Sequence, residues 1–464
     1  MDTGETRSQK AGWIFQLEKL LPLGRVSCEP QVLAEHGTDA WLARALPEAV
    51  VFPRTVEEVS AVLRFAWERD IPVTARGAGR GYVGGCVPVR GGIVLSVAYM
   101  NRIREIDPVD GVAVVEPGVI TGKLAQEARR LGYFYPPDPA SLHESSIGGN
   151  IATNAGGARS LKYGVTKHYV LGLEVVLAEG TIVRVGSRTH KNKTGFDLVS
   201  LFVGSEGLLG VVTEATLRLI PHPPARAVIA AGFEAIERAA AAVENILTSG
   251  LLPSALEIAD RFTVEAARHY LTDVSLPPGQ AHLLVEVDGG PQAVREEGER
   301  VSQILLEAGA IAVESAWEED SCERLWSTRR SFSRALSHQG LLKLNEDVTV
   351  PRSRLVDLFS FVSELARRWG IPIAAFGHAG DGNIHVNLMV NPNQEEEKTR
   401  AQRALDELFA QVLGWGGVLT GEHGIGLAKL SWWPQAVSEP VREIHRKIKR
   451  ALDPKGMLNP GKFV

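Results

Sequence analysis

Two histidines and a Glu-His dipeptide are the residues whose chemistry stands out. His378 and His385 bracket the turn sequence Ala-Gly-Asp-Gly-Asn, and strand-like runs lie on both sides. A hairpin would bring both imidazoles to its mouth. Glu422 and His423 belong to a second, glycine-bounded turn. Two imidazoles and one carboxylate around an open position suit a divalent metal acting as a Lewis acid: zinc fits, and manganese or ferrous iron use similar ligands. Hydrogen bonding of each histidine in a loop or core is the alternative.

A glycine-rich loop at residues 76–85 could approach a phosphate. It reads Arg-Gly-Ala-Gly-Arg-Gly-Tyr-Val-Gly-Gly and contains a literal G-x-G-x-x-G. A Rossmann dinucleotide site needs a helix directly after such glycines, but Pro88 and a strand-like run at 93–97 follow here. We therefore reject the Rossmann interpretation. The backbone N–H groups of the loop can still form an anion-binding nest, and a plain surface loop is the alternative.

A second polar segment favours a large, flat ligand. Between Tyr135 and Gly157 the only charged side chains are Asp138 and Glu144, with His143 among them. Such a segment buries little apolar area of its own, so we expect it to order around something large. Its small residues, amides and hydroxyls suit a ring system with polar edges and phosphates.

The elements that must position these residues indicate an α+β protein. Thr55 and Glu58 form a capping box inside a strand-helix-strand unit that precedes the first glycine loop. Beyond about residue 222, strands alternate with helices, which is typical of an antiparallel sheet backed by helices. The clearest strands are 173–177, 181–185, 227–232 and 283–287, and the clearest helices lie near 234–249 and 291–308.

Composition and charge narrow the class of protein. The 464 residues are 44% hydrophobic and 23% charged, which suits two or three globular units. The net charge of -5 argues against nucleic-acid binding through a basic field and against a polybasic membrane anchor. No stretch approaches the roughly 18 apolar residues that span a bilayer, and we expect no signal peptide. Cys28, Cys86 and Cys322 are too few and too scattered for a disulfide scaffold or a local four-cysteine iron-sulfur cluster. We expect a cytoplasmic, cofactor-using enzyme.

Several motifs together resemble one family. The chain is similar to the FAD-linked oxidases of the vanillyl-alcohol oxidase (PCMH-type) superfamily, and within it to the D-lactate dehydrogenase and glycolate oxidase catalytic-subunit (GlcD-like) branch. The likeness covers roughly residues 45–464. The segments that carry it are 76–85, Pro-Pro-Asp-Pro at 136–139, Ser-Ile-Gly-Gly-Asn at 146–150, Gly-Ser-Glu-Gly-Leu-Leu-Gly-Val-Val at 204–212, and the segments 377–385, 420–424 and 453–462.

The resemblance implies a fold and a cofactor. We expect an FAD-binding PCMH-type domain at 1–221, a substrate or cap domain with an antiparallel sheet at 222–415, and a C-terminal segment at 416–464 that returns to the flavin site. The FAD is expected to be non-covalent, although Cys86 and His143 lie near the relevant loops. The expected FAD-binding residues are Arg76, Gly77, Ala78, Gly79, Arg80, Gly81, Gly84, Gly85, Pro117, Gly118, Pro137, Asp138, Ser141, Ser145, Gly148, Gly149, Asn150, Asn154, Gly156, Gly157, Tyr163, Gly210, Val212 and Asn459.

The resemblance also implies a catalytic apparatus. In similar branch members the His-x6-His pair and the Glu bind metal. His378, His385 and Glu422 are therefore the expected ligands of a divalent metal, and zinc is the expected ion. His423 is the expected base, because an imidazole with a pKa near ~6.5 is largely neutral at physiological pH. Arg329 is expected to bind the substrate carboxylate, with Ser333 one helical turn further on. A solvated position for Arg329 is the alternative.

The expected reaction is oxidation of a small 2-hydroxy acid, D-lactate or glycolate, with hydride transfer to FAD N5. Relatives that act on dicarboxylates carry a Lys where this chain has Asn345, with Lys343 two positions earlier, which disfavours a 2-hydroxyglutarate-like substrate. Electrons would pass to iron-sulfur or flavin partner subunits, or to a quinone, cytochrome or oxygen, which could place the protein peripherally at the inner face of a membrane. The alternatives are a superfamily oxidase of an alcohol or sugar, a D-2-hydroxyglutarate dehydrogenase, a flavin-binding structural subunit and a binding module for phosphorylated ligands.

Overall fold

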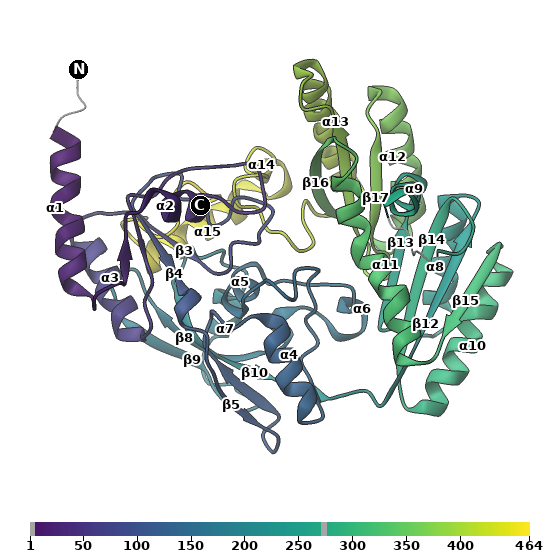
Figure 1. The fold of residues 1–464 in the computed structure, drawn as a ribbon, viewed down its shortest axis with the longest axis horizontal. Coiled ribbons are helices and arrows are strands. Elements are labelled where there is room, and N and C mark those ends of the chain that lie inside the picture. The colour runs from purple at the N-terminus through teal and green to yellow at the C-terminus, as the bar shows by residue number, and fades with distance from the viewer. Residues whose placement is uncertain (1–4, 271–275) are drawn as a thin grey trace. The chain divides into compact units, whose positions relative to one another are not determined.

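The computed structural model describes residues 5–270 and 276–464, without the side chains of residues 5–11. The chain forms two compact units, which we treat separately. Unit 1 comprises residues 1–155, 165–222 and 422–464, and unit 2 comprises residues 156–164 and 223–421. Figure 1 shows the chain from its purple N-terminal elements to the yellow C-terminal helices, which belong to unit 1.

Unit 1 contains two main sheets. The first has the order β1-β2-β4-β3, and the second has the order β5-β6-β10-β8-β9 and is antiparallel throughout. A two-stranded ribbon, β11-β7, completes the strands of the unit. Their bounds are β1 Val26–Ser27, β2 Ala49–Val51, β3 Val73–Arg76, β4 Ile93–Ser96, β5 Ile103–Asp107, β6 Val112–Val115, β7 Tyr133–Phe134, β8 Val170–Val176, β9 Ile182–Gly186, β10 Val211–Arg218 and β11 Ile220–Pro221.

The helices of unit 1 are short to medium in length. Their bounds are α1 Glu5–Leu20, α2 Pro30–His36, α3 Val56–Glu68, α4 Thr121–Arg130, α5 Ile147–Thr153, α7 Leu198–Phe202, α14 Trp433–Ala436 and α15 Glu439–Leu452. The expected strand-helix-strand unit is β2-α3-β3, and both of its strands pair in parallel with β4. The side chain of Thr55 caps α3 by accepting a hydrogen bond from the backbone N–H of Glu58.

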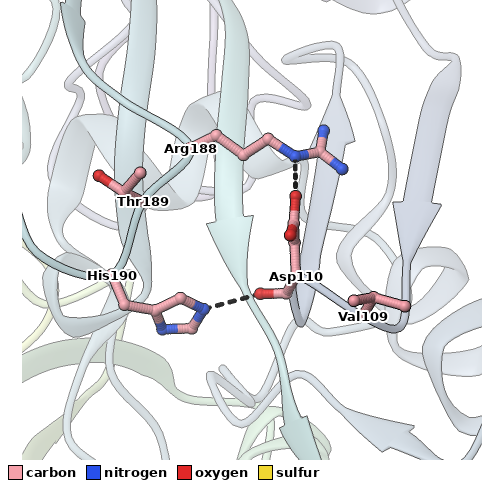
Figure 2. Close-up of a pocket in the computed structure, with 5 residues that line it drawn as sticks. All are labelled: Val109, Asp110, Arg188, Thr189 and His190. Carbon is pink, nitrogen blue, oxygen red and sulfur yellow. Dashed lines mark hydrogen bonds and ion pairs between the residues drawn. The ribbon is translucent and has the colours of Figure 1, made fainter.

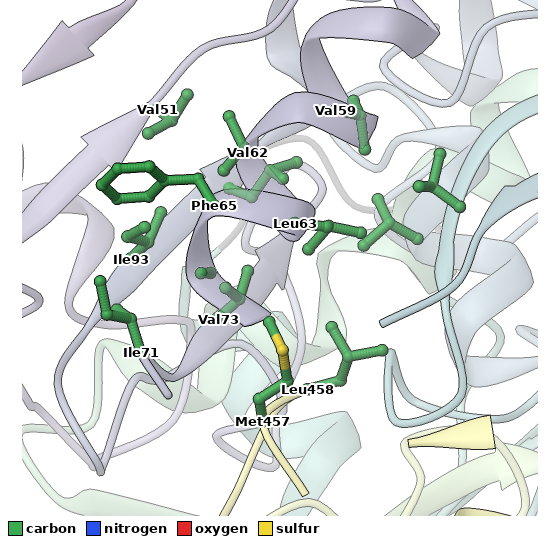
Figure 3. Close-up of a cluster of buried hydrophobic side chains, with 14 of the residues drawn as sticks. Val51, Val59, Val62, Leu63, Phe65, Ile71, Val73, Ile93, Met457 and Leu458 are labelled. Atoms are coloured by element: carbon green, nitrogen blue, oxygen red, sulfur yellow. The ribbon is translucent and has the colours of Figure 1, made fainter. Parts of the chain in front are cut away.

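The core under the first sheet includes residues from both ends of the chain. Leu63 of α3, Ile93 of β4 and Leu458 are fully buried in one apolar cluster (Figure 3). Leu458 forms an isolated parallel bridge with Val73, and the N–H of Asn459 donates to the Val73 carbonyl at 2.7 Å. The C-terminal segment is therefore part of the core of unit 1.

Unit 2 is built on one antiparallel sheet of seven strands. Its order is β15-β12-β14-β13-β17-β18-β16, as expected for a sheet backed by helices. Helices α8, α10, α12 and α13 pack on one side, and α9 and α11 pack on the other. The strands are β12 Ala225–Phe233, β13 Ala255–Ala259, β14 Ala281–Gly289, β15 Ala312–Ala316, β16 Leu342–Thr349, β17 Ile373–His378 and β18 Asn383–Val390. The helices are α6 Ser160–Tyr163, α8 Ile236–Thr248, α9 Arg261–Tyr270, α10 Pro291–Glu307, α11 Glu319–Ser337, α12 Leu355–Trp369 and α13 Glu395–Gly414.

Candidate functional site

The first glycine loop and the polar segment around Ser146 lie against each other in unit 1. The N–H of Ala78 donates to the hydroxyl of Ser146 at 3.1 Å. A Cβ atom at Gly77 would stand only 2.5 Å from that hydroxyl oxygen, so the close approach requires glycine. The N–H of Gly148 donates to the carbonyl of Pro117 at 2.7 Å, which adds a third predicted segment to the same group. These loops form a cradle with little side-chain bulk, which fits a bound phosphate and ring system.

The polar segment contains a helix that we did not expect. Ser146 caps α5 by accepting from the N–H of Gly149 at 3.3 Å. Asn154, with φ of 53°, ends the helix in the left-handed region, and its side-chain oxygen accepts from the N–H of Lys167 at 2.9 Å. The segment therefore gains order from caps at both ends of α5, whereas its composition predicted order only around a ligand.

The other residues of unit 1 that are predicted to bind FAD lie in α5, in loops and at the ends of strands. Asn150 donates from its side chain to the Thr121 hydroxyl at 2.7 Å. Arg80 forms an exposed ion pair with Glu144 at 3.0 Å. Gly210 precedes β10, where an added Cβ would stand 2.5 Å from Val175 Cγ1. The positions that the structure places in loops or strand ends of unit 1 are Arg76, Gly79, Gly81, Gly84, Gly85, Gly118, Pro137, Asp138, Ser141, Ser145 and Val212.

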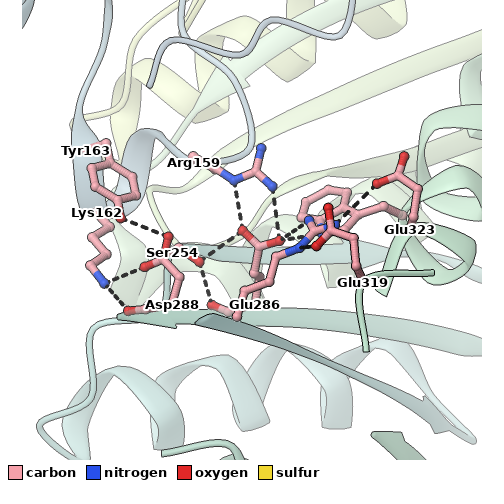
Figure 4. Close-up of polar contacts among 10 residues, drawn as sticks. Arg159, Lys162, Tyr163, Ser254, Glu286, Asp288, Glu319 and Glu323 are labelled. Atoms are coloured by element: carbon pink, nitrogen blue, oxygen red, sulfur yellow. Dashed lines mark hydrogen bonds and ion pairs between the residues drawn. The ribbon is translucent and has the colours of Figure 1, made fainter. Parts of the chain in front are cut away.

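Residues 156–164, which include the predicted Gly156, Gly157 and Tyr163, belong to unit 2. Tyr163 donates its hydroxyl to Asp288 at 2.8 Å, and Lys162 donates to the same side chain at 2.5 Å (Figure 4). Arg159 makes two hydrogen bonds with the buried Glu286, at 2.8 and 3.0 Å. This segment is thus fixed to β14 by three charged or hydroxyl-bearing side chains.

Cys86 and His143 are the residues that bear on a covalent flavin link. The thiol of Cys86 accepts a hydrogen bond from Arg76 Nη1 at 3.1 Å. Burial raises the pKa of the Cys86 thiol, which disfavours the nucleophilic thiolate. His143 is exposed.

The loop that carries His423 is held by a buried glutamate. Glu206 accepts hydrogen bonds from the N–H groups of Ile425 and Gly426, both at 2.8 Å, and burial raises the pKa of its carboxyl group. Gly424 has a φ of 86°, and a Cβ there would stand 2.6 Å from Glu206 Oε1. The ring of His423 lies 5.1 Å from the ring of Tyr82, measured between centroids. Asn459 donates to the carbonyls of Gly85 and Glu206, at 2.9 and 2.8 Å.

The expected histidine hairpin is present in unit 2. β17 and β18 pair antiparallel, with His378 opposite Asn383, and His385 opposite Phe376. Directly opposite residues share a face and side chains alternate along a strand, so His378 and His385 project to the same side of the sheet. The centroids of their rings are 5.4 Å apart.

Gly421, the residue before Glu422, is hydrogen-bonded to β16, the strand that pairs with β18 of this hairpin. The N–H of Gly421 donates to Asp347 Oδ2 at 2.9 Å, and Asp347 lies opposite His385 in the β16-β18 pair. One ligand atom each from His378, His385 and Glu422 lie within 4.8 Å of one another. Two imidazole nitrogens and a carboxylate oxygen at such separations fit a divalent cation.

A buried carboxylate joins His378 to Arg329. Glu257 Oε1 accepts from His378 Nδ1 at 2.7 Å, and Oε2 accepts from Arg329 Nε at 2.6 Å. Burial alone would raise the pKa of Glu257, but Arg329 and His378 lower it overall. Arg329 is therefore a buried, ion-paired residue, so the alternative of a solvated Arg329 is wrong. Its neighbour Arg330 is exposed and pairs with Glu323.

Ser333 follows Arg329 by one turn of α11 and contacts a lysine. The ammonium group of Lys343 donates to the Ser333 hydroxyl at 2.6 Å, and burial lowers the pKa of Lys343. Asn345 lies on the same face of β16, and its side-chain oxygen is buried with no hydrogen-bond partner among the described residues. Polar groups from α11 and β16 thus meet on the side of the sheet that bears the histidines.

A separate pocket lies at the surface of unit 1. It is lined by Val109, Asp110, Arg188, Thr189 and His190 (Figure 2). His190 Nε2 donates to the Asp110 carbonyl at 2.7 Å, and Arg188 pairs with Asp110 and with Glu105. None of the predicted site residues lines this pocket, and its Arg188 is already paired with several carboxylates.

Comparison with known proteins agrees with this architecture. Residues 47–186 match the FAD binding domain, and residues 222–463 match the FAD linked oxidases, C-terminal domain. The chain therefore belongs to the FAD-linked oxidases, with an FAD-binding domain followed by the C-terminal domain of that family. It is an oxidoreductase of the α+β, PCMH-type architecture, which confirms the predicted family, fold class and FAD cofactor.

Several named relatives span most of the chain. It is 40% identical to the glycolate oxidase subunit GlcD of Bacillus subtilis, over 90% of this chain and 89% of that protein. It is also 40% identical to a D-lactate dehydrogenase of Archaeoglobus fulgidus, over 97% of this chain and 99% of that protein. A crystal structure of p-cresol methylhydroxylase with substrate bound has the same fold, with a TM-score of 0.82 and 20% identity over 98% of this chain and 97% of that one.

Two site residues were not predicted from the sequence. Glu206 lies in the Gly-Ser-Glu-Gly motif that supported the family resemblance, so its motif was a usable signal. Glu257 has no such motif, and its partners lie 72 and 121 residues away in the chain. The one available sign was an isolated glutamate inside an apolar strand, Ala-Leu-Glu-Ile-Ala. Because buried carboxylates are almost always paired, such a glutamate indicates a partner elsewhere in the chain.

Proposed function

We propose that this protein oxidises a small 2-hydroxy acid, D-lactate or glycolate, to the 2-oxo acid. The observation that carries the proposal is the cluster of ligand atoms from His378, His385 and Glu422, together with the link from His378 through Glu257 to Arg329. Both features suit a substrate that carries a hydroxyl beside a carboxylate. The names of the relatives, glycolate oxidase subunit GlcD and D-lactate dehydrogenase, support the same substrate class.

The glycine loop and the polar segment that follows it would hold the cofactor. We assign the pyrophosphate to the loop at 76–85 and the rest of FAD to the segment at 137–164, with Gly210, Val212 and Asn459 nearby. The flavin is non-covalent in this proposal, which the raised pKa of the Cys86 thiol supports. FAD, when bound, supplies the acceptor for the hydride that leaves C2 of the substrate. The proposed FAD-binding domain is 1–221, and the proposed substrate domain is 222–415. The proposed C-terminal segment that returns to the flavin site is 416–464.

The histidine hairpin would hold a divalent metal. His378, His385 and Glu422 are the proposed ligands, and zinc suits two imidazoles and one carboxylate. Such an ion would lower the pKa of a substrate hydroxyl. Hydrogen bonding of His378 Nδ1 to Glu257 favours the tautomer that carries its proton on Nδ1, which is the tautomer that a metal ligand at Nε2 needs.

The chain's own groups would bind the substrate and move the proton. His423, on the loop fixed by Glu206, is the proposed base for the 2-hydroxyl proton. Arg329 is the proposed partner of the substrate carboxylate, because a guanidinium has five N–H donors and Glu257 engages only its Nε and Nη2 atoms. Ser333 would add a hydroxyl one turn away. Asn345, in place of the Lys of dicarboxylate-specific relatives, favours a small acid.

In this proposal the reduced flavin passes its electrons to an acceptor other than NAD. Because one group of relatives is named as a subunit, we propose transfer to iron-sulfur or flavin partner subunits, or to a quinone or cytochrome. Within the described residues, no helix is both long and apolar enough to cross a bilayer. We propose a cytoplasmic location, with peripheral contact at the inner face of a membrane when the partners are bound.

Product identification tests the proposed function. Purified, FAD-loaded protein should oxidise glycolate or D-lactate with an artificial dye as acceptor, and should form one glyoxylate or pyruvate for each acid consumed. D-2-hydroxyglutarate and L-lactate should react more slowly. Turnover of simple alcohols or sugars, without turnover of any 2-hydroxy acid, would instead support a different oxidase of the superfamily.

A further inference from the structure

Glu257 is a fully buried carboxylate that contacts two proposed site residues at once. It lies on β13 near the centre of the seven-stranded sheet, opposite His378 in the β13-β17 pair, and is 1% exposed. Oε1 accepts from His378 Nδ1 at 2.7 Å, and Oε2 lies 2.6 Å from Arg329 Nε and 2.5 Å from Arg329 Nη2. The two oxygens therefore serve two different elements, β17 and α11.

The contact with His378 settles how that imidazole can act. A carboxylate oxygen only accepts, so Nδ1 carries a proton, and in the neutral imidazole the lone pair is then on Nε2. A carboxylate behind a ligating histidine also fixes the orientation of the ring and raises its basicity, and removal of such a partner typically costs 10- to 100-fold in metal affinity. Glu257 is thus suited to prepare His378 for a cation.

The contact with Arg329 fixes the guanidinium from one edge. Its central carbon lies 5.0 Å from the centroid of the Phe376 ring and 5.6 Å from that of the Phe332 ring. The carboxylate holds one edge of the group and the two rings flank it, which restricts its rotamers. A group with few accessible rotamers loses less entropy when it binds an anion.

The geometry points to Glu257 as a positioning residue that couples the metal site to the substrate-carboxylate anchor, an inference that rests on the proposed function. Loss of its charge would free His378 to adopt the other tautomer and would leave Arg329 without its partner. Both changes follow from a single side chain, so metal binding and anion binding should weaken together.

The chain contains a matched control for this role. Glu286, on the neighbouring strand β14, is also 1% exposed and also ties α11 to the sheet, through Trp326 Nε1 at 2.7 Å. Its other side-chain partners are Arg159, Arg226 and the hydroxyl of Ser254, and no hydrogen bond or ion pair joins it to a histidine among the described residues. Loss of the Glu286 charge should disturb packing of the same helix without changing a metal ligand.

The test compares zinc affinity in the full-length, FAD-loaded protein. Each variant is stripped of metal and titrated with zinc against a chromophoric chelator, and oxalate binding to the zinc-saturated protein is then measured by calorimetry. Glu257→Gln should weaken zinc binding about 10- to 100-fold and should also weaken oxalate binding. Glu257→Asp, which keeps the charge, should restore part of both affinities. Glu286→Gln should keep wild-type zinc affinity, whatever its stability.

A wild-type zinc affinity in Glu257→Gln would overturn the inference, and so would an equal loss in Glu286→Gln, since that would indicate a general packing defect. If Glu257→Gln does not fold, Glu257→Asp decides the question by the same titration, because its shortened side chain should weaken zinc binding measurably. No substrate turnover enters these measurements. They therefore remain decisive even if no 2-hydroxy acid is oxidised, and a wild-type protein that binds no zinc would contradict the proposed metal site itself.

Discussion

His423 is the residue on which the proposed proton transfer depends. Its loop is anchored by two backbone N–H groups, of Ile425 and Gly426, that donate to Glu206, and a change of the His423 side chain leaves both donors in place. His423→Asn keeps a polar side chain of similar size but removes the base. We expect flavin reduction by substrate to slow by about 10²- to 10⁴-fold, which is the usual contribution of a general base.

The measurement is the single-turnover rate of flavin reduction, followed by absorbance under anaerobic conditions. The FAD content and the zinc affinity of His423→Asn should stay near those of the wild type. Tyr82→Phe, which alters the ring beside His423 and removes only a hydroxyl, serves as the control and should reduce its flavin much faster than His423→Asn. A near wild-type rate in His423→Asn would remove this residue from the mechanism.

At the scale of elements, the cap of α5 connects helix stability to the cofactor cradle. Ser146 accepts from the N–H of Gly149 inside the helix and from the N–H of Ala78 in the glycine loop. Thr55 caps α3 in the same way by accepting from the N–H of Glu58, which lies in the helix that it caps. Ser146→Ala and Thr55→Ala should each lower the free energy of unfolding by about 1 kcal/mol.

Only Ser146→Ala should also weaken FAD binding, because only that change releases the glycine loop. Titration of apoprotein with FAD, followed by fluorescence quenching, measures this difference, and urea unfolding measures the stability of each variant. Equal FAD affinities in the two variants would show that the contact between Ser146 and Ala78 does not shape the cradle.

Glu286 joins β14 to α11 and to Arg159 (Figure 4). Burial alone would raise the pKa of Glu286, but Arg159 and Arg226 lower it to about 2. A carboxyl group whose pKa is lowered on folding stabilises the protein above its unfolded pKa, and this contribution is lost as the pH falls through the folded value. The contribution should be ~3 kcal/mol at pH 7 and about half of that at pH 3.

Urea unfolding of wild type and Glu286→Gln at both pH values measures this change. The difference in free energy of unfolding should be large at pH 7 and clearly smaller at pH 3. Glu299→Gln, which breaks an exposed ion pair with Arg295 on α10, should change stability by less than about 1 kcal/mol at either pH. A pH-independent difference for Glu286→Gln would mean that the carboxyl group is not held in its charged form.

At the scale of the whole molecule, local signals predicted most of the architecture. The glycine loop without a following helix excluded a Rossmann site, and the His-x6-His turn predicted the β17-β18 hairpin that the structure contains. The change of pattern near residue 222 predicted the antiparallel sheet of unit 2. Each of these features depends on residues close together in the sequence, where turn chemistry and alternation can be recognised.

Contacts between distant segments could not be predicted in this way. Glu206 contacts the loop of His423 across 219 residues, and Glu257 contacts His378 across 121 residues. α5 was missed because Ser146 and Asn154, which cap it, also belong to the residue types that favour loops. Sequence patterns thus identified the candidate site residues, whereas the carboxylates that hold them in place required the structure.

The proposed function requires that FAD bound to this protein takes a hydride from a 2-hydroxy acid. The most direct measurement is anaerobic mixing of the full-length, FAD-loaded protein with D-lactate, glycolate, L-lactate and D-2-hydroxyglutarate while flavin absorbance is followed. D-lactate or glycolate should bleach the flavin rapidly, with one 2-oxo acid formed per flavin. A protein that binds FAD but stays yellow with every one of these acids would contradict it.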